Sequence, residues 1–339
     1  MNIILRKFRK RLSSLRARER KFPSSNASVN DKLWAWKHGY SSGMSEMLGL
    51  NDSNLSDFLD PESYENGHPY NAVYSRLIDS KAFLPLFLPA DNVCDVYVVY
   101  QKGRIYYSNT APVNETLDYM KEYTSDNQML FSRPLDSNNR QQVKIISRDN
   151  FNHSVEEIVN RKKSVLITEK VAQHDYSSAV FPESVNTIRI ILMRCPQDSQ
   201  IFTAVAFHRF GTSASVPVDN VSSGGVFCPI VHETGQLYPC YQFGKLYSGW
   251  KETHPDTGKK FEEVVIPGWY DIKSRILKIF NDISWFYFGG LDVVITKNGF
   301  KILEINSLPE CCSAQLIQPY FRSEKITRFF ASKGVTAKR

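Results

Sequence analysis

The segment from Gly290 to Asn306 constrains the fold of this 339-residue chain more than any other. Two runs of strand-forming residues flank Lys297-Asn298-Gly299, a typical hairpin turn, and so predict a pair of antiparallel strands. A three-residue turn would place Asp292 directly opposite Glu304, whereas a two-residue turn would make the carboxylates diagonal neighbours. In both registers Asn306 shares their face, because alternate residues of a strand point the same way.

Two carboxylates held together on an otherwise apolar hairpin cost free energy unless a cation neutralises them. Two carboxylates and one amide oxygen are ligands that suit Mg²⁺, which proteins commonly share with substrate phosphates. The alternative is an ordinary exposed polar face. We therefore interpret Asp292, Glu304 and Asn306 as candidate metal ligands.

The net charge of +7 is concentrated at the start of the chain. Residues 1–21 carry nine Lys or Arg and one Glu, which leaves the remainder with a net charge of about −1. A nearly neutral body argues against a broad nucleic-acid-binding face, and we expect no nucleic-acid partner.

The basic segment also has an apolar stripe, because Leu5, Phe8, Leu12 and Leu15 recur at helical spacing. The pattern predicts a basic amphipathic helix, which can lie on an anionic membrane surface. The alternatives are a helix packed on its own protein, a frayed tail and a mitochondrial transit peptide.

Targeting signals and cysteine spacing indicate the compartment. No apolar run approaches the ~20 residues of a membrane span, and the start is too charged for a secretory signal. The six cysteines form no CxxC pair and the histidines do not cluster beside them, which argues against a zinc site or a disulfide framework. We expect a cytoplasmic protein, peripheral at the inner face of the membrane if the basic helix binds lipid.

Hydrophobic periodicity predicts a mixed α+β fold. We expect helices around 31–48, 70–83, 156–161 and 270–283, and a β-hairpin over 93–107. Further strands are expected at 129–131, 142–146, 164–168, 187–194, 201–210, 226–230, 291–296 and 300–305.

Three further segments occur in a fixed order before the hairpin. Ser184-Val185-Asn186-Thr187-Ile188-Arg189-Ile190 opens a strand, Phe207-His208-Arg209-Phe210-Gly211 follows, and Val218-Asp219-Asn220-Val221-Ser222-Ser223-Gly224-Gly225 comes last. With the hairpin, this order resembles the sugar-transfer-associated branch of the ATP-grasp superfamily, found with polysaccharide and teichuronopeptide assembly genes. The resemblance is best from about Leu166 to Pro309.

The resemblance implies an ATP-grasp fold in which two antiparallel-sheet lobes hold the nucleotide. We expect a basic arm and linker at 1–30, an N-terminal lobe at 31–125, a small central lobe at 126–170 and a C-terminal lobe at 171–339. It further implies that Asp292, Glu304 and Asn306 hold one or two Mg²⁺ ions, with Mn²⁺ as an alternative, on the ATP β- and γ-phosphates.

Arg189 and Arg209 lie on adjacent expected strands of a nearly neutral body. Guanidinium groups beside a metal hairpin suit a phosphoryl group and an acyl phosphate, and we interpret both as catalytic. The backbone of Ser222-Ser223-Gly224-Gly225 can approach an anion closely. The candidate substrate residues are Asn186, Asp219, Asn220, Ser222, Ser223, Gly224 and Gly225. The alternatives are a structural ion pair for Arg189 and a plain turn for the glycines.

By family resemblance, the adenine hinge falls in 166–172, with Glu169 accepting from the adenine amino group and Lys170 and Val171 reading the ring edge. Lys81 and Arg133 resemble the family's phosphate-binding cations. One departure is visible, because Arg133-Pro134 is followed by residues 135–140 without the usual glycines.

The resemblance implies an ATP-dependent carboxylate–amine ligase that works through an acyl phosphate. The expected partners are a uronic-acid-bearing surface polysaccharide or its precursor and an amino acid or amine. The alternatives are a kinase, hence a transferase, of a sugar or amino-acid acceptor, and a nucleotide-binding scaffold without turnover.

Overall fold

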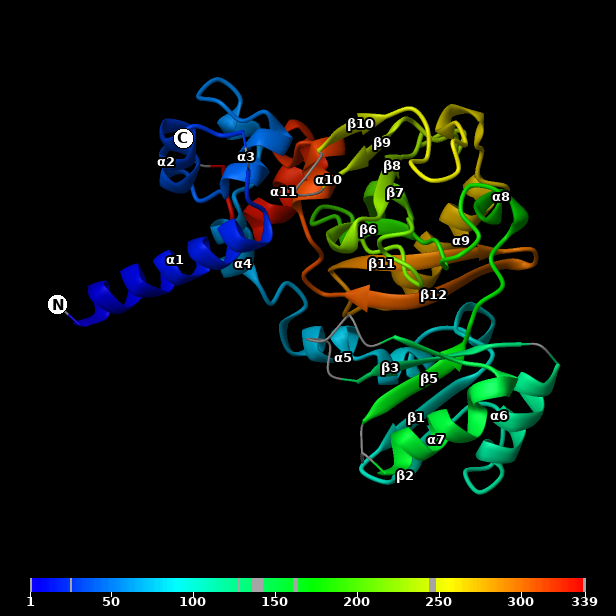
Figure 1. The fold of residues 1–339 in the computed structure, drawn as a ribbon. Helices are drawn as coiled ribbons and strands as arrows, with labels where there is room; N and C mark the ends of the chain where they lie inside the picture. Colours follow the sequence, from blue (N-terminus) through cyan, green and yellow to red (C-terminus); the bar gives the residue numbers. More distant parts are fainter. Residues whose placement is uncertain are drawn as a thin grey trace.

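The computed structural model describes residues 2–24, 26–126, 128–135, 143–160, 164–243 and 248–337, with backbone only for 2–11. Its strands form two sheets that face each other (Figure 1). The small sheet has the order β2-β1-β5-β3-β4 and the large sheet the order β10-β9-β8-β7-β6-β11-β12. All the strand pairs are antiparallel.

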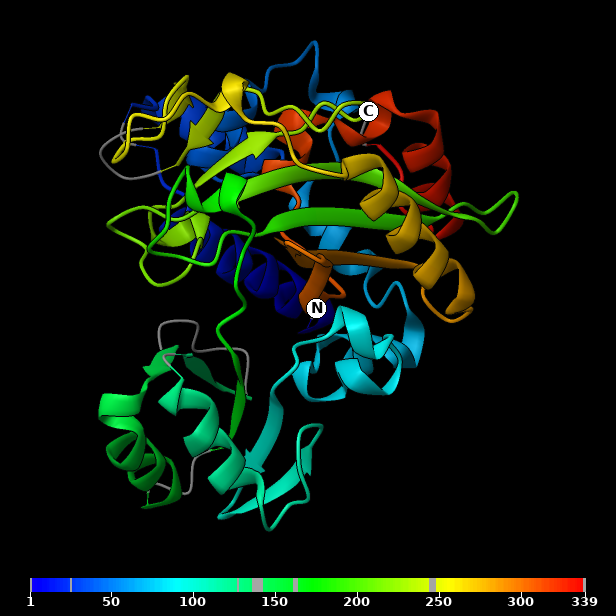
Figure 2. The same ribbon diagram turned by 90° about the vertical axis from the view of Figure 1, so that its right-hand side faces the viewer.

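The small sheet comprises β1 (Tyr97–Gln101), β2 (Arg104–Ser108), β3 (Leu130–Pro134), β4 (Lys144–Ile146) and β5 (Val165–Glu169). Helices α6 (Thr116–Ser125) and α7 (Phe151–Asn160) cover one of its faces (Figure 2). Met120 and Ile158 of these helices are buried against Val98 and Ile167 of the strands.

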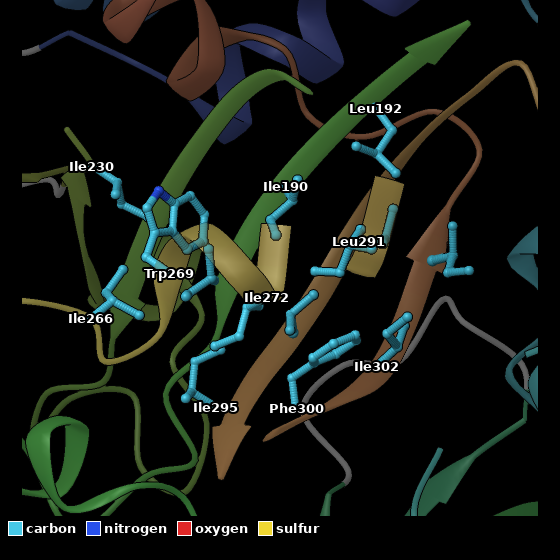
Figure 3. Close-up of a cluster of buried hydrophobic side chains, with 14 of the residues drawn as sticks. Ile190, Leu192, Ile230, Ile266, Trp269, Ile272, Leu291, Ile295, Phe300 and Ile302 are labelled. Carbon is cyan, nitrogen blue, oxygen red and sulfur yellow. The ribbon is translucent and has the colours of Figure 1, made fainter. Parts of the chain in front are cut away.

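The large sheet comprises β6 (Ile188–Arg194), β7 (Ile201–Phe210), β8 (Val226–Pro229), β9 (Cys240–Gln242), β10 (Gly249–Lys251), β11 (Phe288–Thr296) and β12 (Gly299–Asn306). Helix α9 (Trp269–Asp282) packs on one face through Trp269 and Ile272, as Figure 3 shows. Ile190 and Leu291 face this helix. Because side chains alternate along a strand, Arg189 and Asp292 point to the opposite face.

Part of that opposite face is covered by helices from both ends of the chain. They are α2 (Val29–Lys37), α3 (Ser42–Leu48), α4 (Pro61–Gly67), α10 (Cys312–Ile317) and α11 (Glu324–Ser332). Tyr64 and Tyr70 share one buried aromatic cluster with Phe288 and Phe330. The two remaining short helices are α5 (Ser75–Asp79) and α8 (Asp175–Ser178).

These packing relations differ from the expected lobe boundaries. Residues 35–70 share their core with the large sheet, so this part of the expected 31–125 lobe is a layer of the C-terminal lobe. The hairpin of β1 and β2 pairs with β5, so the boundary expected at 125/126 falls inside the small sheet. Sequence patterns identify strands but not their partners in other parts of the chain.

The expected strands all occur in the structure, whereas two expected helices are interrupted. The 31–48 helix is divided into α2 and α3, with Gly39 at φ 90° between them. The 70–83 helix is replaced by α5 and short 3₁₀ turns, the last of which, Lys81–Leu86, contains Pro85. All six cysteines are buried and free of disulfides.

The basic segment forms α1 (Asn2–Lys21), which projects from the body with its N-terminal end outermost (Figure 1). Its C-terminal end is fixed to the body by contacts of Arg18 and Glu19. The Arg18 guanidinium lies 3.3 Å from a Glu65 oxygen, and Glu19 accepts hydrogen bonds from Ser42 and Trp36. Among the described residues, no helix is long and apolar enough to cross a membrane.

Candidate active site

A cleft lies between the two sheets and collects most of the charged residues singled out in the sequence. Its polar and charged lining is Lys81, Arg133, Thr187, Arg189, Arg209, Asp219, Asn220, Asp292, Glu304 and Asn306. Its apolar lining is Phe131, Pro134, Val143, Val185, Pro217, Val218 and Leu303. The large sheet and its loops supply most of the charge, whereas Phe131 and Arg133 come from the small sheet.

A row of charged side chains crosses three strands of the large sheet. Asp292 of β11 pairs directly with Glu304 of β12 on one side and with Arg189 of β6 on the other. The turn has two residues, since Thr296 pairs with Gly299, but Leu303 is an extra residue in β12 that restores direct opposition. Without this β-bulge, the two-residue turn would pair Asp292 with Leu303 and point Glu304 to the other face of the sheet. The expectation that this turn would leave the carboxylates as diagonal neighbours on one face was therefore wrong, and the bulge is what brings them together.

Asp292 is the centre of a buried ion-pair cluster. Its Oδ1 accepts from Arg189 Nε at 2.6 Å, and its Oδ2 lies 2.8 Å from Arg209 Nη2. Burial alone would raise the pKa of Asp292, but the two guanidinium groups outweigh burial and lower that pKa to about 2. The carboxylate is therefore ionised at neutral pH and is neutralised by arginine.

Gly290 makes room for this cluster. A Cβ on Gly290 would lie 2.6 Å from Pro309 Cβ and 3.2 Å from Arg189 Cδ. A larger residue would push the stem of Arg189 away from Asp292. The glycine two positions before Asp292 thus allows the arginine to cross the strand at close range.

Asp219 and Thr187 hold Arg209 from the other side. One Asp219 oxygen accepts from the Thr187 backbone N–H at 2.7 Å and lies 3.5 Å from Arg209 Nε. The Thr187 hydroxyl oxygen accepts from Arg209 Nη2 at 2.5 Å. Burial raises the pKa of Asp219, although Arg209 and Thr187 oppose that shift.

Lys81 reaches the row from a segment remote in sequence. Its Nζ lies 3.1 Å from Glu304 Oε2, and its side chain is largely buried. Asp79, at the end of α5, accepts from both the backbone N–H and the hydroxyl of Ser307, directly after β12. These bonds fix the chain just before Lys81 against the end of the hairpin of β11 and β12.

Arg133 faces the large sheet from β3. Its guanidinium carbon lies 5.8 Å from the centre of the Phe131 ring, and its Nε is buried without a hydrogen-bond partner. Among the described residues, Arg133 is the one cleft-lining cation with no carboxylate in ion-pair contact. An anionic ligand would satisfy this guanidinium.

The donor atoms in the row fit a hard divalent cation. Asp292 and Glu304 supply carboxylate oxygens and Asn306, opposite Gly290, supplies an amide oxygen on the same side of the hairpin. Within the described ranges, no group of three His, Cys, Asp or Glu side chains could hold a metal, so Asn306 is needed to complete this set. Both carboxylates already form ion pairs with Lys or Arg side chains, and a metal would have to bind beside those cations or displace them.

The residues of the expected adenine hinge are not part of this cleft lining. Glu169 is buried and accepts from the backbone N–H of Asp95 at 2.6 Å. Burial raises the pKa of Glu169, and the Asp95 hydrogen bond opposes that shift. The Lys170 N–H donates to the Met129 carbonyl at 2.7 Å, and Val171 is buried between the sheets. These positions lie beside the cleft without lining it.

Several expected substrate residues are structural in their contacts. The Asn186 side chain donates to the Phe181 carbonyl at 2.7 Å and accepts from the Gly211 N–H at 3.0 Å, inside the core. Asn220 lines the cleft, and its side chain also accepts from the Ser222 N–H.

Ser222, Ser223, Gly224 and Gly225 form a turn outside the cleft lining. A Cβ at Gly225 would lie 2.7 Å from the Asp219 carbonyl oxygen. The glycine thus lets the turn approach the Asp219 backbone closely. The expected loop 135–140 falls, apart from Leu135, outside the described residues.

Sequence reasoning missed Thr187. Its hydroxyl joins Arg209 to Asp219, and it lines the cleft beside Arg189. The signal was present, because Thr187 is two residues before Arg189 on a strand and so shares its face.

Comparison with known proteins identifies the family. The family model for sugar-transfer associated ATP-grasp matches residues 128–321, which is more than half of the chain. The chain therefore belongs to the sugar-transfer-associated ATP-grasp family, as the sequence motifs predicted. Its two-sheet architecture is the ATP-grasp fold, and the family implies use of ATP and a divalent metal. No curated protein matches the chain.

Three of the solved structures that match are remote likenesses. The ATP-grasp ligase PsnB, complexed with a minimal precursor, has 9% identity and a TM-score of 0.40, over 73% of this chain and 57% of PsnB. D-alanine–D-alanine ligase from Bacillus anthracis, complexed with ATP, has 12% identity and a TM-score of 0.41, over 76% of this chain and 67% of that one. D-cycloserine synthetase DcsG has 11% identity and a TM-score of 0.41, over 77% and 70%. Scores this low carry no argument about substrates.

Proposed function

We propose that this chain is an ATP- and Mg²⁺-dependent carboxylate–amine ligase. The observation that carries the proposal is the charged row of Arg189, Asp292 and Glu304, which faces Arg133 across the cleft. The row combines oxygen ligands for a metal with cations for phosphate oxygens, which is the arrangement that phosphoryl transfer needs.

In the proposed first step, a carboxylate oxygen of the acceptor attacks the γ-phosphorus of ATP. The bond to the bridging oxygen breaks, and the products are an acyl phosphate and ADP. Asp292, Glu304 and Asn306 would hold Mg²⁺, which would supply positive charge beside the phosphate oxygens. Lys81 and Arg133 bind phosphate oxygens, while Arg189 and Arg209 stabilise the charge of the transferred group.

In the second step, the amine nitrogen attacks the acyl carbon and phosphate leaves. The nitrogen loses one proton, so the products are an amide and inorganic phosphate. The buried bonds of Asp219 and Thr187 fix Arg209 before either step, which lowers the entropic cost of orienting it. We propose that the acceptor is a uronic-acid-bearing glycan or its precursor, and that an amino acid or amine is joined to it.

A hydroxylamine trap tests this function. The full chain is incubated with Mg·ATP, a panel of uronic-acid sugars and hydroxylamine, which captures an acyl phosphate as a hydroxamate. A ligase gives ADP and hydroxamate in equal amounts, and a panel of amines then identifies the natural partner by amide mass. Phosphorylated acceptor without hydroxamate would identify a kinase. Absence of ADP in every combination would favour a nucleotide-binding scaffold.

We also propose that α1 holds the protein against an anionic membrane surface at its cytoplasmic face. The support is the concentration of nine Lys or Arg in residues 1–21 on a helix that projects from the body. Each basic residue near such a surface contributes about 1 kcal/mol. The Arg18 and Glu19 contacts anchor the C-terminal end of α1, so only its outer turns are available to lipid.

The membrane proposal is tested without disturbing the anchored end. Glutamine replaces the five outer basic residues Arg6, Lys7, Arg9, Lys10 and Arg11, and a control variant carries glutamine at three exposed body lysines, Lys102, Lys121 and Lys278. Wild type and control should sediment with anionic vesicles at low salt and release at 1 M salt, where the Debye length is about 3 Å. Equal sedimentation of the five-residue variant would contradict the proposal.

A further inference from the structure

A second cavity, of about 320 Å³, lies outside the cleft and is not used by the proposed function. Its walls come from the first half of β7, from α9, from the segment after β8 and from the start of α11. β8 pairs with β7 only from Phe207 to Phe210, so Ile201–Ala204 border the cavity instead of another strand.

Lys273 of α9 is the main charge in this cavity. The residue is only 8% exposed, and its Nζ donates to the His232 carbonyl at 2.8 Å beside the His232 ring. Among the described residues, no carboxylate lies within ion-pair distance of Lys273. The acid that acts electrostatically on Lys273 is Glu233, whose side chain is 78% exposed. A buried ammonium without a counter-ion is costly unless an anion arrives.

The other walls add donors suited to an anion. Lys325 of α11 lies with its Nζ 5.7 Å from the centre of the Phe202 ring, and both residues line the cavity. Thr203 is also in the lining, but its hydroxyl oxygen is buried away from the cavity surface. The first turn of α11 carries one acid, Glu324, which is paired with Arg328 and does not line the cavity.

Two lysines and, among the described residues, no lining carboxylate describe a receptor for a compact anion. We propose that this Lys273 cavity binds a phosphate monoester, with the phosphate between Lys273 and Lys325. Lysine binds phosphate as a point charge. Phe202 and Ile326 form an apolar part of the lining, and the cavity leaves room beside them for the organic group of the ester.

The burial of Lys273 supports the same inference. Desolvation lowers the pKa of Lys273, opposed only by Glu233. A bound phosphate would stabilise the charged ammonium and offset that desolvation. Trp269 is one turn earlier on α9, and its Nε1 donates to the same His232 carbonyl, so Lys273 is held in place before any ligand binds.

The test is a titration of the full chain with inorganic phosphate and with a hexose 1-phosphate, followed by ³¹P NMR and by thermal melting. Lys273→Met removes the charge and keeps the apolar stem. Lys278→Met is the control, because Lys278 is exposed on the same helix and does not line the cavity. Nucleotide binding in the cleft should be unchanged in Lys273→Met.

We expect saturable binding of both probes in wild type and Lys278→Met, and a loss of at least about tenfold in affinity in Lys273→Met. Phosphate should raise the melting temperature of the wild type but not of Lys273→Met. Equal binding by Lys273→Met and Lys278→Met would overturn the proposal. Exclusion of the hexose ester while inorganic phosphate binds would also overturn it, because the cavity would then accept only a bare ion.

Discussion

The cleft and the Lys273 cavity both gather cationic side chains, but they treat the charge differently. In the cleft, Arg189 and Arg209 lie on Asp292, and Lys81 lies on Glu304. In the cavity, Lys273 has a backbone carbonyl and an imidazole beside it and, among the described residues, no carboxylate. Ion pairs stabilise the ligand-free form of the cleft. An unpaired buried charge instead favours binding of a ligand that neutralises it.

In the cleft, the proposed Mg²⁺ and ATP enter a site where carboxylates and cations already satisfy each other. The metal must then take the carboxylates while the phosphates take the cations. Metal and nucleotide should therefore bind best together. The metal replaces the cations that the phosphates take from the carboxylates, and the phosphates replace the carboxylates that the metal takes from the cations.

Loss of a metal-ligand charge should have the largest effect. Glu304→Gln keeps the size of the side chain and removes the negative charge, so Mg²⁺-dependent ADP release should fall by about 10²–10³-fold or more. The measurement is steady-state ADP release, with circular dichroism as a check on folding. Lys297→Gln at the exposed hairpin turn is the matched control and should keep wild-type turnover. Turnover of Glu304→Gln within threefold of wild type would remove Glu304 from the metal site.

Stability measurements compare the two regions directly. Asp292→Asn leaves Arg189 and Arg209 buried with one charged partner fewer, and the free energy of unfolding should fall by about 3 kcal/mol. Lys273→Met replaces an unpaired buried ammonium with an apolar side chain, and that free energy should stay within about 0.5 kcal/mol or increase. Urea unfolding at pH 7 without added anion measures both. Equal losses in the two variants would contradict the distinction between paired and unpaired charge.

Lys81→Met should separate metal binding from nucleotide binding. Without Lys81, Glu304 has no cation to displace, so Mn²⁺ alone should bind more tightly, as electron paramagnetic resonance can measure. Nucleotide affinity should fall about tenfold, because one charged contact to phosphate is lost. A fall in both affinities would show that Lys81 does not compete with the metal for Glu304.

The sequence predicted the strands of the site well, because period-two alternation is local. It placed Asp292, Glu304 and Asn306 on one face of a hairpin, and that arrangement occurs. It did not fix how the carboxylates come into register, because the bulge at Leu303 depends on how β11 and β12 pack in the whole sheet. Motif order identified the family, since several weak signals in one order are specific together.

Long-range relations were much less visible in the sequence. No local pattern says that Asp79 binds Ser307, or that residues 35–70 pack on the large sheet. The hairpin of β1 and β2 was expected in the N-terminal lobe, because strand patterns carry no information about partners. The roles assigned to Glu169, Lys170 and Val171 came from resemblance alone and stay predictions.

Acid titration should give the smallest effect and should again separate two carboxylates by their surroundings. The folded-state pKa of Asp292 is about 2, below the value of about 3.9 for an unfolded chain. Because the folded pKa is lowered, the stability due to Asp292 is present above pH ~4 and is lost as pH falls toward ~2. At pH 3 the loss should be about 1 kcal/mol relative to pH 5. The stability contribution of Glu169 has the opposite pH dependence, because burial raises the pKa of Glu169 and its contribution is lost as pH rises.

Urea unfolding of wild type and Asp292→Asn between pH 5 and pH 3 isolates the Asp292 contribution, since the amide does not titrate. A wild type and a variant that lose stability in parallel over this range would show that Asp292 keeps an ordinary pKa and that the arginines do not hold it.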